Sequence, residues 1–194
     1  RRPPKEVVMV SLTALWLPIV LSAVIVFFVS AAVWMAMPHH RKDFATVDDE
    51  DSVMDALRPH LSAPGMYYFP FAEGAEMRTE AYKEKVRKGP VAIVKVRSAD
   101  STLNMGPAMM KSLMLYLVVG IFIAYLASRT LPIGTDYMTV FQVTGTAAFL
   151  AYGFIGFQES IWFALPGSVA FKHALDGLVY ALLTAGVFGW LWPA

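Results

Sequence analysis

The sequence predicts a mainly α-helical integral membrane protein, with four transmembrane helices and a small α+β extramembrane insert between helices one and two. The first observation is composition: of 194 residues, 57% are hydrophobic and only 16% are charged, and mean hydropathy is +0.52. Soluble domains carry about 25% charged residues. The second is charge placement, because most charged residues lie within 39–111, while stretches 7–38, 137–158 and 177–194 contain none. A fourth such stretch is 112–128, and a span needs about 20 mostly apolar residues.

These stretches divide the chain into three parts. Residues 1–38 hold an N-terminal segment and the first transmembrane helix, residues 39–108 form the insert, and residues 109–194 hold helices two to four. The first helix is bounded by Trp16 and Trp34, since tryptophan favours membrane interfaces and the interval matches the hydrocarbon thickness of about 30 Å. Pro18 then lies in the first helical turn, where its missing N–H is harmless. The diproline at 3–4 precedes this helix.

The insert has local signals for both helix and strand. An acidic run at 48–51 suits the start of a helix, where carboxylates meet the positive end of the helix dipole. Residues 66–71 and 91–97 are aromatic or β-branched and predict strands, and the charged segment 74–88 predicts a helix. A segment this small makes a poor independent core. We therefore expect the insert to rest on the membrane surface or on a partner.

Small residues recur at helical spacing in the later three helices. The last helix, 174–192, places glycine or alanine at every fourth position, and helices two and three show similar faces. In lipid, close backbone approach drives helix association. These faces predict a tight core of helices two to four with helix one against it. The ridge of the last helix either packs within the chain or meets another subunit. The predicted packing residues are Gly120, Ala124, Ser128, Thr144, Ala147, Ala148, Ala151, Gly177, Ala181, Ala185 and Gly189.

Tryptophans predict where the helices meet the headgroups. Residues 160–167 are too few to span and are expected to lie in the interface. The predicted interface anchors are Trp16, Trp34, Trp162, Trp190 and Trp192.

The sequence contains no recognisable motif for a catalytic, cofactor-binding or metal site, so the chain is not expected to be an enzyme. There is no cysteine, and none of the four histidines lies in the middle of a span. A covalently bound cofactor, or one held through histidine at mid-bilayer, is therefore not expected, although lipid or pigment could lie against the helices. The adjacent His39 and His40 favour a cationic headgroup anchor over a metal site, which needs convergent ligands.

Two acidic residues lie close to predicted spans. Glu159 and Asp176 both fall near the boundary on the insert side. Asp176 is expected to pair with Lys172, four residues earlier on the same helix. The alternative is that Glu159 and Asp176 line an ion path, as ionisable groups in spans often do.

Basic residues near the helix ends indicate orientation. Seven flank the insert side and four the other side, which favours a cytoplasmic insert in a bacterial inner membrane. The first set is Arg41, Lys42, Arg58, Lys95, Arg97, Lys111 and Lys172, and the second is Arg1, Arg2, Lys5 and Arg129.

Several stretches carry a resemblance to a known kind of protein: 38–44 (PHHRKDF), 89–96 (GPVAIVKV), 103–106 (LNMG), 141–156 and 176–193. They resemble a family of uncharacterised four-helix bacterial inner-membrane proteins. The chain is also similar, more distantly, to an accessory subunit of a photosynthetic reaction centre with its light-harvesting rings. The first resemblance implies the fold but no activity, and the second implies a photosynthetic complex as partner.

These observations together predict a non-catalytic accessory subunit that stabilises a larger integral-membrane complex. Its partners would be other membrane subunits and lipids. The net charge of +1 argues against a nucleic-acid partner. One rival hypothesis is a small transporter or channel component that uses Glu159 and Asp176, and another is a membrane enzyme, such as a quinone-linked one, that uses the insert.

Overall fold

A computed structural model describes residues 8–194, which form two compact units. One unit is a helical bundle that comprises the described residues up to Asp43 together with Ala108–Ala194. The other is Phe44–Pro107. The diproline at 3–4 and the basic residues Arg1, Arg2 and Lys5 lie outside the described residues.

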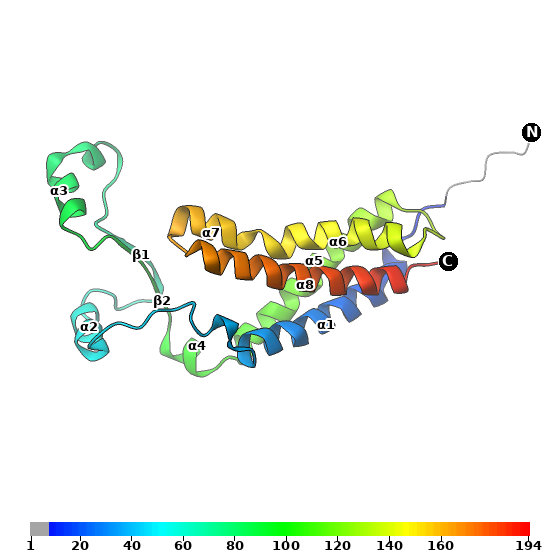
Figure 1. Cartoon of the computed structure of the whole chain (residues 1–194), viewed down its shortest axis with the longest axis horizontal. Helices are drawn as coiled ribbons and strands as arrows, with labels where there is room; N and C mark the ends of the chain where they lie inside the picture. The colour runs from blue at the N-terminus through cyan, green and yellow to red at the C-terminus, as the bar shows by residue number, and fades with distance from the viewer. Residues whose placement is uncertain (1–7) are drawn as a thin grey trace, which may run out of the picture. The chain divides into compact units, whose positions relative to one another are not determined.

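The bundle is made of long, nearly antiparallel helices (Figure 1). The short 3₁₀ turn η1 (Leu12–Leu15) leads into α1 (Trp16–Met35), and α5 (Gly106–Thr130) returns from the insert. After a tight loop, α6 (Tyr137–Gly153) is followed by α7 (Ile155–Phe163) and then α8 (Gly167–Trp190). The chain thus has the helical class and the order of elements that its charge pattern predicts.

Three helical segments are long and apolar enough to cross a membrane: Leu12–Met35, Gly106–Thr130 and Tyr137–Phe163. The fourth predicted span corresponds to α8, which is 24 residues long but carries Lys172, His173 and Asp176 in its first half. Those polar residues reduce its mean hydropathy, so α8 does not meet the same test. The structure therefore supports three of the four predicted spans by length and composition.

Two details at the helix ends compare directly with prediction. Helix α1 begins at Trp16 and ends one residue after Trp34, with Pro18 in its first turn, as predicted. Residues 160–163, the first half of the segment expected in the interface, form the last turn of helix α7. A Cβ added at Gly156 would lie 3.2 Å from Ala170 Cα, so the small residue lets α7 continue closely along α8.

The closest helix pair is α6 with α8. A Cβ built on Gly177 would lie 2.6 Å from Gly153 Cα, and one built on Gly145 would lie 3.1 Å from Ala185 Cβ. Farther along, Gly189 approaches the ring of Tyr137. The four-residue ridge of α8 therefore packs within this chain, against α6.

Helix α1 has a larger share in the core than predicted. Val26 of α1 is fully buried, as is Leu15 in the preceding turn η1, and Ile19 lies over Gly120 of α5, 3.4 Å from the position of an added Cβ. We expected helices two to four to form a tight core with helix one against it, but the small face of α5 packs on α1, where Ile19 lies over Gly120. Because the small face of α5 packs on α1, a groove remains between α5 and α6.

One end of the bundle is tied by backbone hydrogen bonds. Ile133 N–H donates to Val8 O at 2.9 Å, and Gly134 N–H donates to Pro193 O at 2.9 Å. Trp192 Nε1 donates to Pro132 O at 3.1 Å. The described N-terminal residues, the α5–α6 loop and the C-terminus therefore share one end, as the topology from sequence requires.

The insert Phe44–Pro107 holds a two-stranded antiparallel sheet and short helices. Strand β1 (Gly65–Phe69) pairs with β2 (Ala92–Val96), with Tyr67 opposite Val94. The helices are α2 (Glu50–Leu57), α3 (Glu80–Lys88) and α4 (Ala99–Leu103), with a 3₁₀ turn η2 (Pro38–His40) before the insert and η3 (Gly74–Arg78) inside it. Both strands and the acidic helix start are confirmed. The helix expected over 74–88 is interrupted at Thr79, where the backbone is extended and the side chain caps α3 by accepting from Tyr82 N–H.

No side chain of Phe44–Pro107, all of which the structure describes, is buried. Phe44 is 82% exposed and Leu103 is 86% exposed. The sheet and helices of this unit are thus held by local hydrogen bonds and partial packing, without an interior of their own.

Candidate functional site, a histidine and carboxylate cluster

A cluster of histidine, aspartate and lysine side chains lies where the C-terminal end of α1 meets the first turns of α8. Pro38 cannot continue helix α1, and the chain turns in η2. This turn directs His39 and His40 toward Asp176 of α8. Residues more than 130 positions apart in the sequence thereby form one site.

His40 is the centre of the cluster. It is only 6% exposed. Its Nδ1 lies 2.5 Å from Asp43 Oδ2, and its Nε2 lies 2.8 Å from Asp176 Oδ2. His39 contributes a longer contact, with Nε2 3.3 Å from Asp176 Oδ1. Two carboxylates therefore share the two ring nitrogens of one buried histidine.

The two carboxylate contacts determine how many protons His40, Asp43 and Asp176 must hold between them. An ionised carboxylate can only accept hydrogen bonds, and a neutral imidazole has a single N–H to donate. His40 can satisfy both carboxylates only if its ring carries two protons, or if one carboxyl group is protonated. Either way the cluster holds an extra proton, unless another cation takes that place.

Lys172 neutralises one of the two carboxylates. Its Nζ donates to Asp43 Oδ1 at 2.5 Å and to the backbone carbonyl of His39 at 2.8 Å. Burial of Asp43 acts to raise its pKa, but the hydrogen bonds from Lys172 and His40 outweigh burial and hold the pKa below its usual value. Asp43 is thus ionised at neutral pH and fully engaged.

Aromatic rings hold the His40 ring in place. The indole of Trp34 is stacked on His40 with ring centroids 4.0 Å apart and an interplanar angle of 2°. The ring of His173 lies 5.8 Å from that of His40 and 5.5 Å from that of Trp34. Stacking fixes the plane of the imidazole and leaves its nitrogen edges free for the carboxylates.

Sequence reasoning found some members of the site and missed others. It singled out His39, His40 and Asp176, but paired Asp176 with Lys172. The structure corrects that pairing, since Lys172 binds Asp43 while Asp176 binds the two histidines. Asp43 and His173 were missed as partners. The only available signal was the dense charge of the segment after Pro38, which reads equally well as a hydrated anchor.

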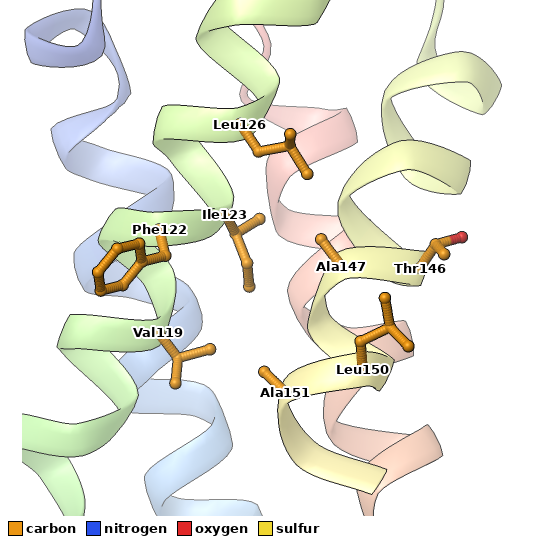
Figure 2. Close-up of a pocket in the computed structure, with 8 residues that line it drawn as sticks. All are labelled: Val119, Phe122, Ile123, Leu126, Thr146, Ala147, Leu150 and Ala151. Carbon is orange, nitrogen blue, oxygen red and sulfur yellow. The ribbon is translucent and has the colours of Figure 1, made fainter. Parts of the chain in front are cut away.

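A second feature is an apolar groove between α5 and α6, with a volume of about 430 Å³ (Figure 2). Figure 2 shows Val119, Phe122, Ile123 and Leu126 on one wall, with side chains of α6 on the other. The α6 wall consists of Thr146, Ala147, Leu150 and Ala151.

The groove divides the small face predicted on α6. Thr144 and Ala148 are buried in the bundle, whereas Ala147 and Ala151 line the groove and Ala151 is exposed. On the other helices, Gly120, Ala124, Ser128, Gly177, Ala181 and Ala185 are buried and Gly189 is half-buried. Of the predicted packing residues, Ala151 is therefore exposed in the bundle, whereas Ala147 is half-buried and packs partly against the core.

The predicted interface tryptophans lie at the two ends of the bundle. Trp16 and Trp190 are exposed at the end that holds the C-terminus, while Trp34 and Trp162 are exposed at the other. Trp192 is half-buried and packs on the core with its indole N–H bonded to Pro132.

Glu159, the other acidic residue of the predicted ion path, lies in α7. Among the described residues, two groups of side chains converge closely enough to hold a metal ion, and Glu159 belongs to neither. Those groups are His39 with His40 and Asp176, and His40 with Asp43 and His173.

No protein-family model, no curated protein and no solved structure matches this chain.

Proposed function

We propose that this protein is a non-catalytic accessory subunit that stabilises a larger integral-membrane complex. The observation that carries the proposal is the apolar groove between α5 and α6, which is lined by two small residues, the half-buried Ala147 and the exposed Ala151. In lipid, small residues on a helix surface favour close contact with another helix. A transmembrane helix of a partner subunit is the occupant that this groove suits.

The insert supports the same proposal. A unit with no buried side chain gains little hydrophobic stabilisation from folding alone. Exposed apolar side chains such as Phe44, Phe71 and Leu103 offer area that a partner subunit or the membrane surface would cover.

The kind of complex is part of the proposal. The resemblance described above names a photosynthetic reaction centre with its light-harvesting rings in a bacterial inner membrane. The lining of the groove is almost wholly apolar, with only the hydroxyl of Thr146 as a polar group, which also suits a pigment tail or an acyl chain. The excess of basic residues on the insert side favours a cytoplasmic insert.

Filling the groove tests the proposal. We expect Ala151→Leu to shift the protein from a large assembly to its own size, because the larger side chain blocks helix approach while remaining compatible with lipid. The measurement is mild detergent extraction from the native membrane followed by native gel electrophoresis. Ala32→Leu, at an exposed alanine of α1, is the matched control and should leave the assembly intact. Migration of the unmodified protein as a monomer or homodimer would refute the subunit hypothesis.

The transporter hypothesis is favoured by one observation, the buried His40–Asp176 contact of 2.8 Å at the bundle end. It predicts that the full chain in lipid vesicles dissipates an imposed pH gradient and that Asp176→Asn abolishes this activity. The subunit proposal instead predicts no faster dissipation than in empty vesicles. A fluorescent pH indicator trapped inside the vesicles distinguishes the two outcomes.

A further inference from the structure

We infer that His39, His40 and Asp176 form a binding site for one divalent first-row transition metal, with Asp43 as the carboxylate that orients His40. This inference goes beyond the subunit proposal and stands on separate residues. It rests on the convergence of three donor atoms from two distant segments of the chain.

The donor atoms lie at distances that a metal can bridge. His39 Nε2 is 3.3 Å from Asp176 Oδ1, and His40 Nε2 is 2.8 Å from Asp176 Oδ2. In a tetrahedral site with metal–nitrogen bonds of about 2.0–2.1 Å, donor atoms are separated by roughly 3.3 Å. Each of the three residues offers one ligand atom, and these atoms lie within 4.8 Å of one another, so the groups converge on one point.

A metal also resolves the proton requirement of His40. With an ion on Nε2, His40 is a neutral imidazole whose single N–H, on Nδ1, donates to Asp43 at 2.5 Å. Asp176 is then an anionic ligand rather than a second acceptor in need of a proton. All three groups are satisfied without an extra proton.

The surroundings of His40 are those of a metal ligand. Histidine ligands almost always donate their second ring nitrogen to a carboxylate or carbonyl, which fixes the tautomer and the ring orientation. Here that carboxylate, Asp43, is 3% exposed and is held by Lys172. Trp34 is stacked on the ring and fixes its plane.

The alternative group, His40 with Asp43 and His173, suits a metal less well. Both oxygens of Asp43 are already engaged, Oδ1 by Lys172 and Oδ2 by His40. The side chain of His39 is 33% exposed, compared with 5% for His40, and so gives an ion a route to the site.

The donor chemistry identifies the class of metal. Two imidazole nitrogens and one carboxylate oxygen suit Zn²⁺ and its first-row neighbours rather than Ca²⁺ or Mg²⁺, which prefer oxygen ligands. Three protein ligands leave a coordination position for water or for a group supplied by a partner.

The test uses the full chain, without a histidine tag, purified in mild detergent and treated with a chelator. We expect calorimetric titration with Zn²⁺ to give one site per chain, and Co²⁺ to produce visible absorption bands of a low-symmetry nitrogen and oxygen site. His39→Ala should weaken Zn²⁺ binding at least about 10-fold, and Asp43→Asn should weaken it about 10–100-fold through loss of the orienting contact. His60→Ala, at an exposed histidine of the insert, is the matched control and should bind as the unmodified chain does.

The inference is overturned if the unmodified chain binds no Zn²⁺ and gives no Co²⁺ spectrum. It is equally overturned if His39→Ala and His60→Ala weaken binding to the same extent, since that pattern indicates scattered surface sites. The unmodified chain alone decides the first outcome, so a variant that fails to fold leaves the test valid.

Discussion

Replacement of His40 with leucine is expected to destabilise the helical bundle by about 3–5 kcal/mol, the usual cost of removing one partner from a buried ionic network. The substitution leaves the carboxylates of Asp43 and Asp176, which are 3% and 13% exposed, without the ring that joins them. Lys172 compensates only Asp43. The measurement is denaturant unfolding of the full chain in detergent, followed by helical circular dichroism.

Two controls separate charge from packing in this experiment. Adding Asp176→Asn to the His40→Leu variant removes the carboxylate that keeps only the longer contact with His39, and should recover part of the lost stability. His60→Leu, at an exposed position of the insert, should change stability by less than about 0.5 kcal/mol. If His40→Leu proves as mild as His60→Leu, the cluster does not hold α1 to α8.

Gly177→Ala is expected to destabilise the bundle by about 2 kcal/mol or more, even though alanine is the better helix former by about 1 kcal/mol. The added Cβ would lie 2.6 Å from Gly153 Cα and 2.7 Å from Gly153 N. Both atoms belong to the backbone of α6, so relief requires the two helices to separate. Thermal unfolding of the full chain in detergent measures the effect.

The matched control lies on the same helix. An added Cβ at Gly186 would have only the hydroxyl of Tyr137 nearby, at 3.8 Å, which is ordinary contact. Gly186→Ala should therefore leave stability unchanged or raise it by up to about 1 kcal/mol through helix propensity. A similar gain from Gly177→Ala would contradict the close backbone approach of α6 and α8.

Local features of this fold follow closely from the sequence. Trp16 and Trp34 mark the ends of α1, and the acidic run places the start of α2, where Asp49 accepts a hydrogen bond from Ser52 N–H. Such features depend on residues near one another in the chain. The ridge through Gly177 was equally legible, because four-residue spacing on a helix defines a face.

The helix partners and the polar cluster were harder to predict. The small face of α5 suits several neighbours equally well, and only the folded bundle shows that Gly120 lies under Ile19 of α1. The contact between His40 and Asp176 joins positions 136 residues apart. Single-sequence patterns encode periodicity along one element, but not which distant side chain shares a buried ring.

The absence of an interior in Phe44–Pro107 affects how this region can evolve. A substitution there removes no tightly packed neighbour, so the cost to folding is small at nearly every position. Selection on the insert therefore acts mainly through what it touches. Among related chains, the insert should diverge in step with its binding surface while the glycine contacts of the bundle stay constant.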